Sequence, residues 1–108
     1  MAKDYNIGLL IDFYGSLLSS RQMDIITLYY EEDLSLSEIA ADVGITRQGV
    51  RDSVKKAEAI LTEAEEKLGL AERFKELSEK MDIIKEKLLG LEDEKLVPII
   101  EMIDSLEI

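Results

Sequence analysis

Residues 34–58 have the sequence LSLSEIAADVGITRQGVRDSVKKAE, and this stretch decides the fold. Ser35 is a good helix-capping residue, and Glu38 lies three residues later, where it completes a capping box. Gly44 suits a tight left-handed turn, because glycine has no Cβ that would clash in that conformation. Thr46 can then cap a second helix. The segment therefore predicts two helices joined by a glycine turn, which is a helix-turn-helix.

The second helix of this motif has an apolar side and a polar side. Its apolar residues recur at helical spacing and are expected to face inward: Val50, Val54, Ala57 and Leu61. Its capping residue Thr46 and its long polar side chains are expected to point away from this apolar side. A recognition helix that enters the major groove of DNA has the same division. We take these as the candidate nucleic-acid-binding residues: Thr46, Arg47, Gln48, Arg51, Lys55 and Lys56.

The chemistry of each side chain suits one part of DNA. Arg47 and Gln48 lie on the first turn, where side chains reach base edges, and arginine and glutamine pair with guanine and adenine respectively. Arg51 is expected to face the bases as well. Lys55 and Lys56 lie further along the helix and suit contacts with phosphate.

The charge distribution singles out the same segment. The chain has a net charge of −11, but residues 46–60 carry four bases against two acids. By contrast, residues 1–45 carry two bases against eight acids, and residues 61–108 carry seven against fourteen. Asp52 in the same segment would repel phosphate unless its carboxylate has another partner. That partner is either a cytosine amine, which donates a hydrogen bond, or a lysine three or four residues later, Lys55 or Lys56. The bases of residues 46–60 therefore attract phosphate, whereas the negative charge of the whole molecule repels it.

Composition narrows the class of protein. A chain of 108 residues with 46% hydrophobic residues suits one domain, or one domain with a helical extension. It has no cysteine and no histidine, which removes thiol chemistry and the commonest general base and transition-metal ligand. Since no nucleophile–base pair, phosphate loop or metal-ligand spacing is visible, we expect no enzyme, no catalytic residue, no metal site and no cofactor. The lack of a secretion signal and of a membrane-spanning apolar run favours a cytoplasmic protein.

Apolar residues recur at helical spacing along nearly the whole chain, which predicts an all-α fold of five or six helices. The first stripe is expected to form one helical face: Ile7, Leu10, Phe13, Tyr14, Leu17 and Leu18. Ser19 and Gln22 offer a second capping box at the start of the next helix. Pro98 is the only proline, and a last helix tolerates it in the first turn.

Beyond Gly69 the apolar spacing alternates between three and four residues over three heptads, as in a coiled-coil seam. The heptad stripe consists of Leu70, Phe74, Leu77, Met81, Ile84, Leu88 and Leu91. It suits either a helix packed back on the first helix or a self-association surface. Because helix-turn-helix proteins usually dimerise to place two recognition helices in adjacent groove turns, we expect a homodimer.

The expected domain organisation follows from these patterns. A helix-turn-helix domain is expected at 1–68, with the motif itself at about 35–58. An acidic C-terminal helical extension is expected at 69–108, either packed on that domain or dimerising with it.

Several stretches spread over nearly the whole chain match a known pattern: Ser20-Arg21-Gln22-Met23, Leu28–Ser35, Glu38-Ile39-Ala40, Gly44-Ile45-Thr46-Arg47-Gln48, Val50, Glu58 and Pro98-Ile99-Ile100. Through them the chain resembles region 4 of sigma factors and, more closely, the YlxM family of small bacterial helix-turn-helix proteins. The resemblance implies a sigma-region-4-like helical bundle, DNA binding and transcription regulation. It also implies a link to the signal recognition particle pathway, since such proteins are often encoded beside the particle's GTPase. The chain departs from the pattern at Gly49, which lowers helix propensity by ~1 kcal/mol relative to alanine.

Three interpretations stay open at this point. The motif and its clustered cations favour a DNA-binding regulatory protein. The same helices also suit a plain packing unit with no nucleic-acid partner. Finally, the acidic body suits a non-enzymatic interaction protein that binds a protein or RNA component of the signal recognition particle rather than DNA.

Overall fold

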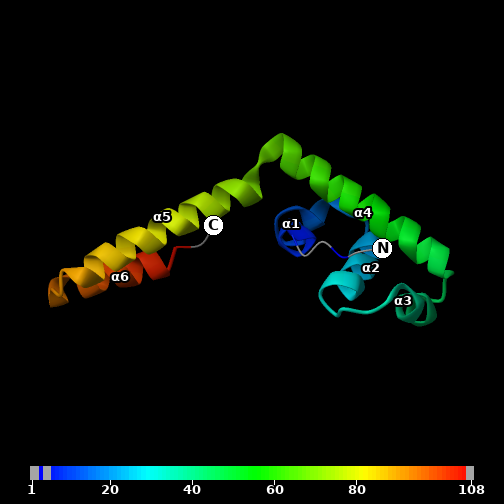
Figure 1. Ribbon diagram of the computed structural model, residues 1–108, viewed down its shortest axis with the longest axis horizontal. Helices are drawn as coiled ribbons and strands as arrows, with labels where there is room; N and C mark the ends of the chain where they lie inside the picture. Colours follow the sequence, from blue (N-terminus) through cyan, green and yellow to red (C-terminus); the bar gives the residue numbers. More distant parts are fainter. Residues whose placement is uncertain (1–2, 4–5, 107–108) are drawn as a thin grey trace. The chain divides into compact units, whose positions relative to one another are not determined.

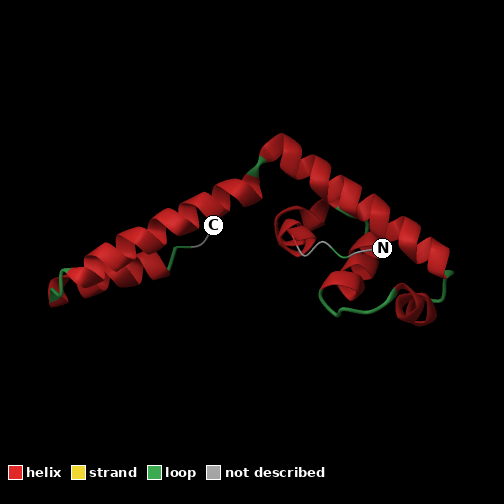
Figure 2. Ribbon diagram, viewed as in Figure 1, coloured by secondary structure: helices red, strands yellow, loops and turns green. Residues whose placement is uncertain are grey.

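The computed structural model describes residue 3 and residues 6–106, and in this part of the chain it contains helices and turns but no strand. The all-α prediction is therefore confirmed (Figure 1, Figure 2). The helices are α1 (Asn6–Tyr14), α2 (Ser20–Tyr30), α3 (Leu36–Val43), α4 (Arg47–Leu68), α5 (Leu70–Gly90) and α6 (Val97–Asp104), with short 3-10 helices η1 (Gly15–Leu17) and η2 (Glu94–Leu96). The chain divides into two compact units, Met1–Ala71 and Glu72–Ile108.

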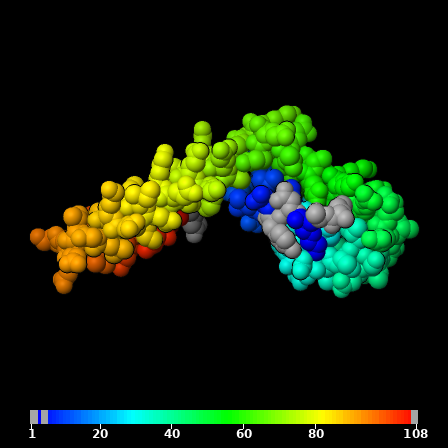
Figure 3. All heavy atoms as spheres, viewed as in Figure 1, coloured from blue at the N-terminus to red at the C-terminus, as the bar shows by residue number. Residues whose placement is uncertain are grey.

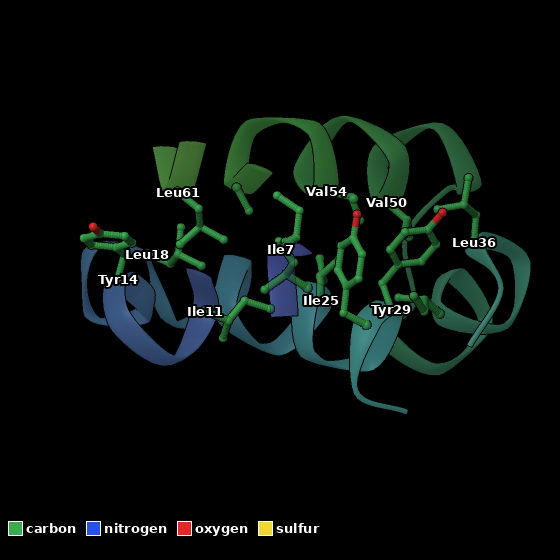
Figure 4. Close-up of a cluster of buried hydrophobic side chains, with 14 of the residues drawn as sticks. Ile7, Ile11, Tyr14, Leu18, Ile25, Tyr29, Leu36, Val50, Val54 and Leu61 are labelled. Carbon is green, nitrogen blue, oxygen red and sulfur yellow. The ribbon is translucent and has the colours of Figure 1, made fainter. Parts of the chain in front are cut away.

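In the first unit, α4 lies across α1, α2 and α3 and contacts all three (Figure 1). The core lies between α4 and these helices, where the labelled side chains point toward one another (Figure 4). All four residues predicted to face inward from α4 are fully buried: Val50, Val54, Ala57 and Leu61. Ile26 of α2 and Ile39 of α3 are fully buried in the same core. Because burial of such an aliphatic side chain contributes ~1.5–3 kcal/mol, α4 is the helix on which the unit is built.

Both predicted capping boxes are present. The Ser19 hydroxyl accepts from the Gln22 backbone N–H at 3.1 Å, and the Gln22 side chain accepts from the Ser19 N–H at 2.9 Å. Ser35 and Glu38 make the same reciprocal pair at the start of α3, with both bonds at 3.1 Å. These bonds satisfy N–H groups that a helix start leaves without a partner, so local sequence sets where α2 and α3 begin.

The first helix is shorter than the apolar stripe predicts. α1 ends at Tyr14, and η1 carries the chain to Leu17, whose side chain is 57% exposed. A Cβ at Gly15 would lie 3.1 Å from the Met23 Cε, so the missing side chain lets α2 pack close to this turn. The stripe prediction is therefore wrong at Leu17, whereas Tyr14 and Leu18 are buried as expected.

A buried tyrosine joins α1 to the end of α4. The Tyr14 hydroxyl donates to the Glu65 carboxylate at 2.6 Å and accepts from the Leu70 N–H at 3.0 Å. The same Glu65 carboxylate accepts from the Ala71 N–H at 3.0 Å. Burial and the hydrogen bond to Glu65 raise the pKa of the Tyr14 hydroxyl above its ordinary value of 10. The first N–H groups of α5 are thus capped by side chains from two other helices.

The second unit contains most of α5, together with η2 and α6. Pro98 lies in the first turn of α6, as predicted, where its missing N–H costs no helical hydrogen bond. An ion pair between Lys85 and Asp104 joins α5 to α6. None of the described residues of this unit is buried, so these residues form no closed core.

Candidate nucleic-acid interface

The turn before α4 is formed as the sequence predicts. Gly44 follows α3 with a φ of 80°, in the left-handed region that glycine adopts without steric cost. Its N–H and that of Ile45 both donate to the Ala40 carbonyl, at 2.9 and 3.2 Å. The Thr46 hydroxyl then caps α4 by accepting from the Gly49 N–H at 2.9 Å. These bonds fix the point at which the candidate binding residues begin.

Gly49 has a role in this cap. A Cβ at Gly49 would lie 3.1 Å from the Thr46 Oγ1 and 3.6 Å from the Ile45 Cδ1. Any side chain there would therefore press on the capping hydroxyl. Glycine costs ~1 kcal/mol of helix propensity, and the cap that it accommodates is worth a similar ~1 kcal/mol. The glycine at this position thus has a local structural reason.

The predicted binding residues lie on the exposed side of α4. All six side chains are exposed to solvent: Thr46, Arg47, Gln48, Arg51, Lys55 and Lys56. Val50 and Val54, on the opposite side of the same helix, are fully buried. In the space-filling view, α3 and the start of α4 meet at one end of the first unit (Figure 3). A ligand that approaches this end therefore meets polar side chains on a helix held rigidly from behind.

Three of the six residues gather around one surface hollow of about 350 Å³. The hollow is lined by Leu36, Arg47, Gln48 and Arg51. Lys55 and Lys56 do not line it and lie one to two turns further along α4. The candidate residues therefore form a compact group at the start of the helix and a separate lysine pair.

The Gln48 side chain already has a partner. Its amide donates to the Asp52 carboxylate at 2.9 Å, one turn later on α4. Asp52 therefore pairs with Gln48, and not with Lys55 or Lys56, which was one of the alternatives that the sequence left open. Helical side chains lean toward the N-terminus, which brings a short carboxylate closer to the residue four positions before it than to those after it. Any base edge bound by Gln48 has to compete with Asp52 for the amide.

Sequence reasoning missed Lys3, which the fold brings to the same end of the first unit. Its ammonium donates to the Asp33 carboxylate at 2.7 Å and to the Leu34 carbonyl at 3.2 Å, and it lies 4.4 Å from the centre of the Tyr29 ring. Together with Arg47 it lines a second hollow, of about 410 Å³. Lys3 and Asp33 are 30 positions apart, so no local signal in the sequence could have indicated the pair.

Carboxylates lie close to the cationic side of α4. Glu38 lines the same second hollow as Lys3 and Arg47. Hydrogen bonds with Ser35 lower the pKa of Glu38 below its usual 4.5, so this carboxylate stays ionised at neutral pH. Asp42 is also exposed on α3. The basic surface of α4 therefore borders an acidic α3, which weakens its attraction for phosphate.

Within residue 3 and residues 6–106, no group of three or more acidic, cysteine or histidine side chains is arranged to hold a metal ion. Nor does any helix there combine the length and the apolar character needed to cross a membrane.

The fold, the glycine turn and the exposed cationic helix define a helix-turn-helix protein. The chain belongs to the UPF0122 family, whose model, described as "Putative helix-turn-helix protein, YlxM / p13 like", matches residues 1–99. The chain is 44% identical over 107 residues to a UPF0122 protein of Desulforamulus reducens, and the alignment covers 99% of this chain and 79% of the relative. It is 40% identical over 108 residues to the UPF0122 protein YlxM of Bacillus subtilis, with 99% and 98% covered. The family resemblance seen in the sequence is thus confirmed.

Proposed function

We propose that this protein binds DNA through the first half of α4 and acts as a cytoplasmic regulatory protein. One observation carries the proposal. Arg47, Gln48 and Arg51 share a hollow at the exposed start of a helix whose other side is fully buried. A recognition helix requires this division, because the buried side holds it rigid while the N-terminal side chains reach base edges.

The side chains divide into two roles under this proposal. Arg47, Gln48 and Arg51 face base edges, and the amide of Gln48 exchanges its bond with Asp52 for one with a base. The separate lysine pair, Lys55 and Lys56, contacts phosphate. Thr46 holds the first turn of α4 in place by capping it.

The acidic balance of the chain limits the strength of this binding. With a net charge of −11 and carboxylates on α3, the molecule as a whole is repelled by a phosphate backbone. Non-specific binding depends almost entirely on phosphate attraction, so it is weak here. Binding is therefore expected on a specific site, or beside a partner that supplies further contacts, and it is sensitive to salt.

We also propose that the heptad stripe of α5 pairs with a second copy of the chain. In the second unit three members of the stripe are 43–67% exposed: Leu77, Ile84 and Leu91. Six large apolar residues of the same unit that lie off the stripe are 46–68% exposed: Ile83, Leu89, Val97, Ile99, Met102 and Leu106. α5 carries five acids and five bases, so a second α5 meets no net repulsion. A homodimer would provide two recognition helices for two half-sites.

A second candidate function follows from the same acidic surface. A body with a net charge of −11 suits docking on a basic protein surface, such as an RNA-binding component of the signal recognition particle. In that case the helix-turn-helix serves as an interaction scaffold rather than as a DNA reader.

One experiment separates the two functions. Binding to genomic DNA fragments and to a reconstituted signal recognition particle is measured for the wild type, for R47A/R51A, and for the control K75A/K80A, which removes two exposed cations of α5. Loss of DNA binding in R47A/R51A alone supports the DNA-binding function. If no variant binds DNA while all bind the particle, the DNA-binding function is wrong.

A further inference from the structure

A groove lies between α2 and α3 and includes none of the six residues assigned to DNA. Its volume is about 690 Å³. It is lined by residues from α2, from the loop after α2 and from α3: Asp24, Thr27 and Leu28; Glu32 and Leu34; and Glu38, Asp42 and Val43. The α2 residues follow the i, i+3, i+4 spacing of one helical face, so that face of α2 forms one wall of the groove.

The floor of the groove is apolar and firmly held. Leu28, Leu34 and Val43 are each half-buried and pack against the core of the first unit. The Leu34 N–H donates to the Leu28 carbonyl at 3.0 Å, which ties the loop to the end of α2. An apolar partner surface would therefore meet a preformed floor, and little ordering of this protein would be needed on binding.

The rim of the groove is acidic. Four carboxylates line it: Asp24, Glu32, Glu38 and Asp42. Among the described residues, no lysine or arginine lines it. Glu38 is engaged in the α3 capping box. The side chains of Asp24, Glu32 and Asp42 make no ion pair or hydrogen bond with any other residue that the structure describes, so their charges are not neutralised there. The groove therefore combines an apolar floor with uncompensated negative charge.

We infer that this groove binds a basic amphipathic helix of a partner protein. The apolar side of such a helix covers Leu28, Leu34 and Val43, and its lysines or arginines meet the carboxylates of the rim. Nucleic acid is repelled by the same carboxylates. A second copy of this chain fits poorly, because neither α5 nor α6 has a net positive charge: α5 carries five acids and five bases, and α6 carries two acids and no base. The partner site is independent of DNA binding through α4.

The test uses a synthetic probe and matched variants. The probe is a leucine–lysine peptide of about 18 residues with apolar side chains at helical spacing, above the ~12–15 residues at which isolated helices become marginal. A scrambled peptide of identical composition has no apolar side. The groove variant is D24K/D42K, and the control is D12K/E66K, which makes the same charge change at exposed carboxylates of α1 and α4 outside the groove. Affinities come from titration calorimetry, and amide chemical shifts locate the contact.

The expected result is a difference between the two variants of equal net charge. D24K/D42K should weaken binding of the amphipathic peptide by roughly tenfold or more, while D12K/E66K should change it by less than about threefold. Wild-type amide shifts should change at α2 and α3, and R47A/R51A should bind the peptide normally. If D24K/D42K does not fold, D24N/D42N should show a smaller loss in the same direction.

Other outcomes overturn the inference. Equal losses in both variants, or equal binding of the scrambled peptide, would mean general attraction to an acidic protein. Shift changes confined to α5 and α6 would place the contact on the second unit. Because R47A/R51A leaves the groove intact, these failures are separate from a failure of DNA binding.

Discussion

Single residues fix the geometry of the turn that starts the recognition helix. Gly44 has a φ of 80°, which a side chain with a Cβ adopts only at a cost. Gly8 lies inside α1 with ordinary helical geometry, and a Cβ there would meet nothing within 4 Å. The same substitution at these two glycines therefore probes backbone conformation separately from packing.

We expect Gly44→Ala to lower the free energy of unfolding by ~1–2 kcal/mol, because alanine is strained at positive φ. Gly8→Ala should instead raise it by ~0.5–1 kcal/mol, since alanine loses less entropy in a helix interior than glycine. Urea denaturation of both variants measures the two changes. Effects of the same sign at both positions would contradict the turn geometry.

The Tyr14 hydroxyl offers a second test at this scale. Tyr14→Phe removes the bond to Glu65 and the acceptor of the Leu70 N–H, so it should lower the midpoint of thermal unfolding. Tyr29→Phe is the control, because it keeps the buried ring beneath Lys3. The hydroxyl that it removes makes no hydrogen bond with any residue that the structure describes. An equal loss in both variants would show that the hydroxyl network contributes nothing.

At the scale of elements, the sequence predicts the helix boundaries that local signals set and misses the early end of α1. Ser19 and Ser35 cap through residues three positions away, so their signal is local and can be seen in the sequence. At the early end of α1, Met23 of α2 lies close to Gly15 of η1. Sequence spacing carries no information on such a contact between elements, and the prediction of one helical face from Ile7 to Leu18 was wrong at Leu17.

The candidate site shows the same limit. The cluster of cations at the start of α4 could be predicted because all of its members lie on one helix. The arrival of Lys3 beside Arg47 depends on tertiary position and has no local signal in the sequence. The bond between Gln48 and Asp52 joins residues at i and i+4 of one helix, so its signal was present in the sequence and was missed. These two features decide how many donors are free.

The capping box of α3 predicts a pH effect. Because bonds with Ser35 hold the pKa of Glu38 below 4.5, ionised Glu38 stabilises the fold above that pH. The contribution is lost as the pH falls through the lowered pKa of the folded state. Wild type should therefore be more stable than Glu38→Gln at pH 7, and the gap should narrow below pH 4.5. A gap that is constant from pH 7 to pH 3 would rule out this contribution.

At the scale of the whole molecule, the described residues of the second unit expose apolar side chains and form no closed core. We expect the wild type to sediment as a dimer at tens of micromolar, a concentration at which ~8 kcal/mol of association free energy suffices. L77E/I84E should give a folded monomer, because it puts charge on the heptad stripe. L9E/L17E makes the same change at comparably exposed leucines of the first unit and should leave the dimer intact. A monomeric wild type at high micromolar concentration would refute the dimer.

The salt dependence of DNA binding tests the central claim most directly. Association constants for a DNA fragment that binds the wild type are measured at several salt concentrations for wild type, K55A/K56A and the control K75A/K80A. With about three phosphates neutralised per protomer, the slope of log K against log salt should be about −3 per protomer. K55A/K56A should reduce its magnitude by about 2, and K75A/K80A should leave it unchanged. Equal slopes in all three proteins, or no DNA binding at low salt, would contradict the assignment of α4 as a recognition helix.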